Sequence, residues 1–579
     1  MELSFSDMTQ HNLPQFVEAL KQEPATLSKL SFCPSKKTVK VREWAEEMRA
    51  TQTSATSAAL YKALPEFARL KIDTETRLEM LDQVRPLAQH TIEGLTREFL
   101  NRPINASEDA HRSAIIAQAL QKAMIDGYAK CVEELCSVKR FRPTTKELLA
   151  RSLHRAISGI SHLFFRSYQL YIEQPEGFWH KLHALFQIAD YFDLLANSVL
   201  DPMLKTTRAT NLQTAYMRVL VMATAKLNQL KHNDISYIYD GLETWAQYTR
   251  LHPSNYQDSD LFYLVNISSD LPPIYRSRFE GKSSDRVLQL NFKVLVSLLS
   301  KLSPNESSLS TDSHGSLTLP KGFPLALLDH LTSCWSSISQ RQQERRSVQG
   351  KAEICIGLVN VHSCICDQSF DDFVEEDLSA GYSQDVMDVF SPAEDEDKAV
   401  HKSSAPRHEV SVQNVSSGGY CLLWKKDMPQ KLQAGELIAM KEKGRHSWTV
   451  GVIRWLRQFK ESSQLGIQIL GNHPKAFGAG QMYDMGGYAD YMRAIYVPAA
   501  KNGKMPASIL TSSAPFKEGD KVKVYDGEKS FKARLTRKLF STTSVQQFAY
   551  QPIEVAQGDG SSNKPNKKAG TQGFDNNWE

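Results

Sequence analysis

A cluster of arginines lies past the middle of the chain, in the stretch "RQQERRSVQGK". Arg341 and Arg345 form an Arg-x-x-x-Arg pair, and Arg346 follows directly. The planar guanidinium of arginine binds a phosphate group, or the O6 and N7 atoms of guanine, through two parallel hydrogen bonds, and it stacks on nucleobases. The cluster is therefore suited to a ligand that carries phosphates and purines. The alternative is the solvated end of a helix, where positive side chains suit the helix dipole.

A second polar group follows farther along, within "VSVQNVSSGGYCLLW". Asn414, Ser416 and Gly419 form the pattern Asn-x-Ser-x-x-Gly. Asn and Ser supply short hydrogen-bonding groups that fit guanine edges or phosphate oxygens. Gly419 has no side chain to block a ligand, and it can adopt φ > 0 in a turn. The same residue types are common in hairpin turns, so the pattern alone is equally well explained as a turn.

Short strands must position these two groups. "AEICIGLVNVH" is predicted to form a first strand, and "HEVSVQ", "ELIAMKE", "WTVGVIRWLR" and "LGIQIL" are predicted to form later ones. Many short strands at even spacing favour a small, closed or nearly closed β-barrel. An acidic stretch at about 367–406 interrupts them, and we interpret it as an inserted loop or a disordered excursion.

An arginine cluster, then a strand end carrying [Asp/Asn]-x-Ser-x-x-Gly, then "GVIRWLRQFKESSQLGIQIL" resembles the PilZ family, receptors for the bacterial second messenger cyclic di-GMP. The resemblance covers roughly residues 341–470. It implies a PilZ-like β-barrel over 341–475 and cyclic di-GMP as the ligand. The ligand-binding residues that it implies are Arg345, Arg346, Asn414, Ser416 and Gly419, with Arg341 as an alternate.

Residues 10–340 are predicted to be an all-α bundle or array. Apolar residues recur every three or four positions on two predicted helices separated by Pro175 and Gly177. The first set is Leu153, Ile157, Ile160, Phe164, Tyr168 and Tyr171, and the second is Leu182, Leu185, Phe186, Ala189, Phe192 and Val199. We expect this helical domain to bind a protein partner.

A second small β-barrel-like domain is predicted over 488–555, with a hairpin turn at Gly527. The polar residues 556–579 are predicted to be a disordered tail. The fold class is therefore multidomain α + β, with a helical domain followed by two small β domains.

The composition argues against several classes of function. A net charge of +4 on 579 residues argues against binding of long nucleic acid. No signal peptide or apolar span of about 20 residues is evident, so we expect a cytoplasmic protein. The eight cysteines are interpreted as buried or incidental thiols, and His154, His162, His180 and His183 as packing residues, so no metal is expected.

We therefore predict a bacterial signalling receptor that controls motility, surface attachment (biofilm formation) or exopolysaccharide output. The main alternative is a degenerate PilZ-fold adaptor that binds no nucleotide. An enzyme is the third and weakest hypothesis, because no catalytic motif appears. The tripeptide "EAL" at Glu18–Leu20, which names a cyclic di-GMP phosphodiesterase family, lies in a helical region without strands and is interpreted as coincidence.

Overall fold

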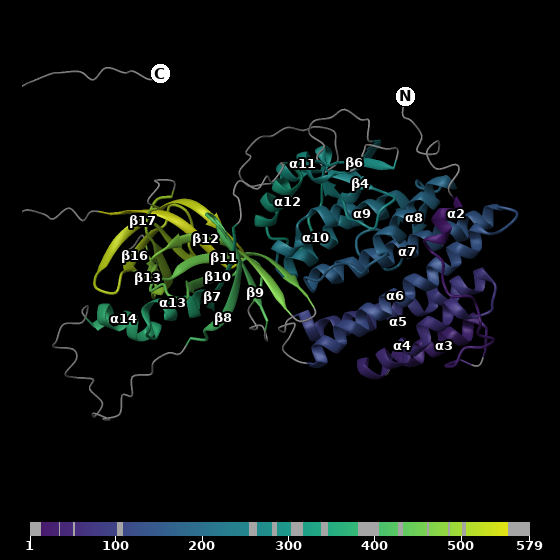
Figure 1. Ribbon diagram of the computed structural model, residues 1–579, viewed down its shortest axis with the longest axis horizontal. Helices are drawn as coiled ribbons and strands as arrows, with labels where there is room; N and C mark the ends of the chain where they lie inside the picture. Colours follow the sequence, from purple (N-terminus) through teal and green to yellow (C-terminus); the bar gives the residue numbers. More distant parts are fainter. Residues whose placement is uncertain are drawn as a thin grey trace, which may run out of the picture.

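The computed structural model describes most of residues 13–553, with a helical part at one end and two β-barrels at the other (Figure 1). The gaps in that range are 34, 50–51, 101–107, 254–262, 281–285, 303–316, 337–345, 380–404, 426–431, 460–461, 484–486 and 501–504. The predicted tail, 556–579, lies outside the described residues. No helix in the described ranges is long and apolar enough to cross a membrane.

The N-terminal part is mainly helical, as predicted. Its helices are α2 (Leu13–Glu18), α3 (Thr38–Arg49), α4 (Thr53–Arg69), α5 (Thr74–Leu100), α6 (Glu108–Cys136), α7 (Pro143–Gln169), α8 (Phe178–Tyr191), α9 (Leu212–Thr224), α10 (His232–Trp245), α11 (Lys293–Ser300) and α12 (Ala326–Ser336), with 3-10 turns η1 (Leu227–Gln229), η2 (Ala246–Tyr248) and η3 (Arg276–Arg278). The break between α7 and α8 is confirmed, because Gly177 has φ +81° and precedes α8.

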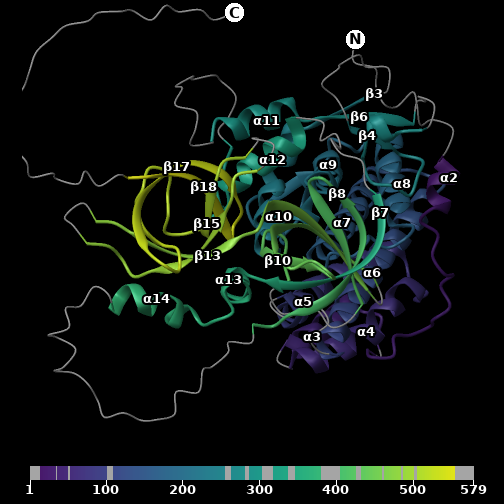
Figure 2. The same ribbon diagram turned by 60° about the vertical axis from the view of Figure 1, so that its left-hand side comes forward.

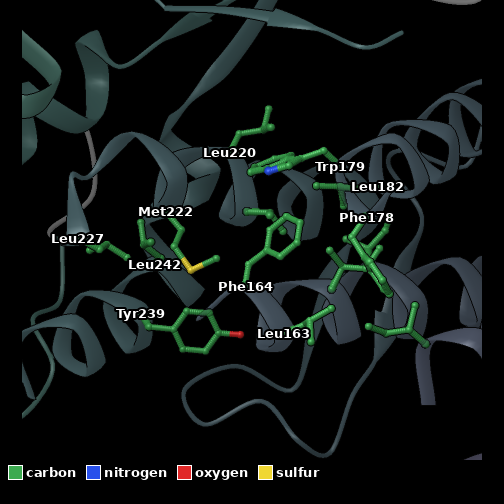
Figure 3. Close-up of a cluster of buried hydrophobic side chains, with 14 of the residues drawn as sticks. Leu163, Phe164, Phe178, Trp179, Leu182, Leu220, Met222, Leu227, Tyr239 and Leu242 are labelled. Atoms are coloured by element: carbon green, nitrogen blue, oxygen red, sulfur yellow. The ribbon is translucent and has the colours of Figure 1, made fainter. Parts of the chain in front are cut away.

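The apolar faces of α7 and α8 form the centre of this part (Figure 3). Phe164 of α7 lies 4.7 Å from Trp179 of α8 between ring centroids. Of the predicted face residues, Leu153, Ile157, Ile160, Phe164, Leu182, Leu185 and Ala189 are all 0% exposed. Val199 was predicted to continue the second helix, but it lies in strand β1 (Ser198–Leu200).

The prediction of an all-α region is wrong around 198–291. β1 pairs with β2 (Ala209–Asn211), and a four-stranded sheet has the order β3-β6-β4-β5. Its strands are β3 (Arg250–Pro253), β4 (Tyr263–Asn266), β5 (Ile274–Tyr275) and β6 (Val287–Asn291). These strands are two to five residues long, and four of the five residues of β6 are buried. Such a short apolar run has too few residues for its period to distinguish a strand from a helix.

The first barrel is closed, and its strand order is β10-β11-β12-β9-β8-β7. Figure 2 shows its strands β7, β8 and β10. Its strands are β7 (Arg346–Ile356), β8 (His408–Ser416), β9 (Gly419–Trp424), β10 (Leu437–Glu442), β11 (Thr449–Gln458) and β12 (Ser463–Asn472). Every neighbouring pair is antiparallel. Val410 and Val412 of β8 point into the apolar core, so the predicted alternation is confirmed.

The second barrel is also closed, with the order β13-β14-β15-β18-β17-β16. Its strands are β13 (Lys475–Gln481), β14 (Met492–Val497), β15 (Ser508–Ser512), β16 (Lys521–Tyr525), β17 (Ser530–Ser541) and β18 (Val545–Pro552). Gly527, with φ +95°, lies in the predicted turn between β16 and β17. The strand β13 was not predicted, because its sequence "KAFGAGQ" is rich in glycine and alanine.

The start of the acidic insertion is helical, which corrects two predictions. The first strand ends at Ile356, and Gly357 (φ +84°) leads into α13 (Leu358–Cys366) rather than more strand. α14 (Phe370–Ser379) then follows, where an irregular excursion was predicted. Phe373 of α14 packs on Tyr525 of the second barrel, and Asp377 accepts a hydrogen bond from Tyr491 at 2.8 Å. Tertiary packing therefore orders acidic residues whose composition predicts disorder.

Two cysteines also depart from their predicted role as unpaired thiols. Cys355 of β7 and Cys364 of α13 form a disulfide. The reversal of the chain at Gly357 brings them together, and their separation of nine residues carries no recognisable signature. Cys33, Cys131, Cys334 and Cys421 are buried and form no disulfide, as expected.

Candidate nucleotide site

The pairing of β7 with β8 brings the end of the arginine segment to the Asn-x-Ser-x-x-Gly pattern. Arg346 lies opposite Val415, and Ser347 lies opposite Asn414. A register shift follows between Ser347 and Gly350, so β7 is irregular next to the site. The two polar groups that are far apart in the sequence are therefore neighbours in the barrel.

The Asn-x-Ser-x-x-Gly pattern forms the end of the β8–β9 hairpin. Ser416 lies opposite Gly419, and Asn414 lies opposite Cys421. The Ser416 hydroxyl donates to the Gly419 carbonyl oxygen at 3.3 Å. Asn414 and Ser416 are two positions apart in one strand, so their side chains leave the same face of the sheet. Both are partly exposed.

Gly419 serves a purpose other than the expected turn conformation. Among the described residues with positive φ, Gly419 does not appear, so the predicted use of φ > 0 is not made. A Cβ atom on Gly419 would lie 2.0 Å from the carbonyl oxygen of Ile467. The glycine is required because β9 and β12 approach too closely at this point for any side chain.

The acidic insertion leaves the barrel at the opposite end of this strand pair. The β7–β8 pairing runs from Arg346–Val415 at the site to Ile354–His408 at the far end. The chain departs from β7 after Ile356 and returns before His408. The insertion therefore does not separate Arg346 from Asn414.

The positive side of the site is only partly described. Arg346 is exposed, and within the described ranges no carboxylate lies within ion-pair distance of it. Among the described residues, no acid therefore competes with an anionic ligand for Arg346. Arg341 and Arg345 lie outside the described residues, in the segment between α12 and β7.

Further residues join the same face through the strand register and were missed from the sequence. Gln468 of β12 lies opposite Gly419, and Gln413 accepts a hydrogen bond from Gln464 at 2.9 Å. The indole of Trp455 covers Gly466, where a Cβ atom would lie 1.9 Å from Nε1. The sequence motif "GVIRWLRQFKESSQLGIQIL" predicted the two strands that carry Trp455, Gln464 and Gln468. Only the strand register shows which of its residues lie beside the Asn-x-Ser-x-x-Gly pattern.

One partly exposed acid at the end of β10 supports the hairpin. The Tyr420 hydroxyl donates to Glu442 at 2.7 Å. Burial, and then this hydrogen bond, raises the pKa of Tyr420 to about 12. The tyrosine therefore stays neutral and ties β9 to β10 at neutral pH.

The histidines of the helical part are separate from this site. His183 is buried, with its Nδ1 2.7 Å from the Tyr216 hydroxyl, and burial lowers its pKa to about 4. Burial lowers the pKa of His154 to about 3. Within the ranges that the structure describes, no three His, Cys, Asp or Glu side chains are grouped to hold a metal.

Comparison with known proteins matches the chain in three consecutive parts. The family model "Cyclic-di-GMP receptor FimW, N-terminal domain" matches 39–255, and "Cyclic-di-GMP receptor FimW, middle PilZ domain" matches 262–400 and 379–475. "FimW C-terminal beta-barrel domain" matches 477–553. No solved structure is significantly similar to the chain.

A curated protein of Pseudomonas aeruginosa is similar over its whole length. It is described as "Cyclic-di-GMP receptor FimW", and it is 28% identical over 608 aligned positions, which cover 97% of this chain and 98% of the relative. The three family models follow the same order as the helical part and the two barrels. The chain therefore belongs to the FimW family of cyclic di-GMP receptors, and its middle part contains a PilZ domain.

Proposed function

We propose that this protein binds cyclic di-GMP at the first barrel, through Arg341, Arg345, Arg346, Asn414, Ser416 and Gly419. The observation that carries the proposal is the β7–β8 register, in which Arg346 and Ser347 lie opposite Val415 and Asn414. The Pseudomonas aeruginosa relative, described as a cyclic di-GMP receptor, supports the same ligand.

The chemistry of each group matches a part of this ligand. Cyclic di-GMP carries two phosphates and two guanines. The arginines bind phosphates or guanine edges with two hydrogen bonds each, and their flat faces stack on the bases. Asn414 and Ser416 offer donors and acceptors from one face of β8, and the hairpin presents no side chain at Gly419. These residues bind the ligand by hydrogen bonds and stacking and break no bond in it, so the proposed role is that of a receptor and not of an enzyme.

Ligand binding is coupled to the helical part through the arginine segment, which joins α12 to β7. A ligand that binds both this segment and the barrel favours one arrangement of the helices against the barrel. The two parts already touch where the Gln458 N–H donates to the Tyr171 carbonyl oxygen at 2.8 Å. The proposed output is a protein partner of the helical part, in the cytoplasm, that controls motility, attachment or exopolysaccharide production.

Calorimetric titration of the full chain with cyclic di-GMP tests the proposal. We expect saturable binding, and we expect the double variant Arg345→Ala/Arg346→Ala to weaken it at least tenfold, since each charged hydrogen bond contributes about 1.5–3 kcal/mol. Arg534→Ala is the matched control, because Arg534 is exposed on β17 of the second barrel. Absence of binding by the wild type would instead support the nucleotide-free adaptor.

A further inference from the structure

A second polar cavity lies inside the helical part, far from the barrel site in sequence. It is about 40 Å³ in volume and is bordered by α7, α9, α10 and the turn between β1 and β2. Residues on its walls include Ser158, Ser161, His162, Thr214, Arg218 and Tyr239. A buried water needs about 10–15 Å³ measured in this way, so the cavity has room for a few waters or one small ion.

The carboxylates that border the cavity are already engaged. Asp201 accepts two hydrogen bonds from Arg85, at 2.6 and 2.9 Å. The Glu243 carboxylate accepts hydrogen bonds from the backbone N–H groups of residues 205–207, at 2.6 to 3.0 Å. Asp240 pairs with Lys205 at 2.9 Å. These acids close the turn over the cavity and leave no carboxylate to neutralise further cations.

Arg218 lines the cavity, and Arg166 lies one turn of α7 beyond the lining residue His162; neither has such a partner among the described residues. Arg218 lies over the Tyr239 ring at 4.0 Å and donates from Nη2 to the Tyr239 carbonyl oxygen at 2.8 Å, while its Nε has no acceptor. Arg166 is 4% exposed, and its Nε and Nη1 have no acceptor. Among the described residues no carboxylate forms an ion pair with either arginine, and Glu93 acts on Arg166 only from a greater distance.

Arg166 lies close to a residue that lines the cavity. Arg166 follows His162 by one turn of α7, so the two residues share a face of the helix. Tyr239 contacts both α7 and Arg218. Its hydroxyl lies 3.1 Å from Ser161 Oγ on α7, and Arg218 lies over its ring. Figure 3 shows the Tyr239 hydroxyl at the edge of the apolar cluster, pointing away from Leu242.

The arrangement keeps positive charge where water is largely excluded. Burial lowers the pKa of Arg166 to about 10, which still leaves the guanidinium charged at neutral pH. Burial, followed by Arg166 and Arg218, lowers the pKa of His162 well below its ordinary value, so this histidine adds a neutral N–H donor. A buried cation without a counter-charge costs several kcal/mol unless an anion compensates it.

We propose that this cavity binds a small oxyanion, such as phosphate or the terminal phosphoryl or carboxylate group of a small molecule, held by Arg218 with the hydroxyls of Ser158 and Thr214. The cavity is too small for a cyclic dinucleotide, so the ligand differs from that of the barrel site. The proposal does not depend on nucleotide binding at the barrel.

Thermal unfolding of the full chain in phosphate, with chloride at equal ionic strength as reference, tests the site. We expect Tm to rise with the logarithm of the phosphate concentration above Kd, by about 2 °C at 100 times Kd. Arg218→Gln is expected to abolish the rise, and Arg140→Gln, a change at an exposed arginine after α6, is expected to retain it. Acetate and a phosphomonoester as separate additives distinguish a carboxylate from a phosphoryl ligand. No rise with any of the three, or an equal rise in Arg218→Gln, overturns the proposal.

Arg166→Met gives a second, independent readout. Because the substitution removes an uncompensated buried charge, we expect its Tm in chloride to equal or exceed that of the wild type. In phosphate the variant is expected to lose at least half of the wild-type rise. A lower Tm in chloride together with an undiminished phosphate response contradicts the proposed role of Arg166.

Discussion

Ser347 of β7 and Asn414 of β8 lie opposite each other on neighbouring strands of the first barrel, at the edge where the arginine segment joins it. We expect Asn414→Ala to weaken cyclic di-GMP binding about tenfold, since one hydrogen bond to a charged or polar ligand is lost. Calorimetric titration measures the effect. Asn472→Ala is the control, because Asn472 is the last residue of β12 and its side-chain oxygen accepts a hydrogen bond from the Thr449 hydroxyl at 2.9 Å. Equal loss in both variants contradicts a direct role for Asn414.

Gly419→Ala tests the close approach of β9 and β12. The new Cβ atom would lie 2.0 Å from the Ile467 carbonyl oxygen, so the strands must separate. We expect the free energy of unfolding to fall by about 1–3 kcal/mol in urea denaturation, with weaker ligand binding. Gly350→Ala is the matched control in β7, where the nearest atoms to a Cβ are 3.9 and 4.0 Å away. If both variants are equally stable, steric crowding does not explain Gly419.

The sequence predicted the barrel and its polar edge because both depend on local patterns. The alternation around Val410 and Val412 indicates which face of β8 is buried, and the Asn-x-Ser-x-x-Gly pattern lies at a strand end. Which other residues lie next to this edge depends on the pairing of strands that are far apart in the sequence, and no local pattern encodes that pairing. Gln468 reaches the site because it pairs with Gly419, and α14 is ordered because Phe373 packs on Tyr525. The role of Gly419 is likewise set by Ile467, a residue of another strand.

Lys231 joins the helical part to both barrels. Its Nζ lies 3.0 Å from Glu436 before β10 and donates to Ser544 Oγ between β17 and β18. Both charged side chains are about one-fifth exposed, so removing Lys231 leaves Glu436 partly buried without its counter-charge, although Ser544 still donates to it. We expect Lys231→Met to lower the free energy of unfolding by about 1–2 kcal/mol and to separate the unfolding of the helical part from that of the barrels.

Urea denaturation followed by both circular dichroism and tryptophan fluorescence checks this prediction. Coincident curves in the wild type and separate curves in Lys231→Met are the expected result. Lys21→Met is the control, because the Lys21–Glu18 pair is exposed and within one helical turn, so its loss is not expected to change stability measurably. Coincident curves in Lys231→Met contradict a coupling role for this residue.

His362 of α13 makes the contact between the insertion and the second barrel sensitive to pH. The ring is fully buried, its Nε2 lies 3.1 Å from the Phe477 carbonyl oxygen, and burial lowers its pKa to about 4. Above about pH 6.5 the ring is neutral in both the folded and unfolded chains. As the pH falls from 6.5 toward 4, the unfolded chain gains a proton that the folded chain does not. Stability is therefore lost on acidification, by about 1.4 kcal/mol per pH unit for this group.

His362→Gln isolates this contribution, because glutamine retains an N–H donor for Phe477 but does not titrate. Other buried histidines, such as His183, keep their own pH dependence in the variant. We therefore expect the free energy of unfolding to fall less steeply between pH 6 and pH 5 in His362→Gln, by about 1.4 kcal/mol per unit, when urea denaturation is measured at each pH. Near pH 7.5 we expect position 362 to add no pH dependence to the free energy of unfolding of either protein. Identical slopes between pH 6 and pH 5 would show that His362 is protonated equally in the folded and unfolded chains, and that the insertion is docked too loosely on β13 to bury it.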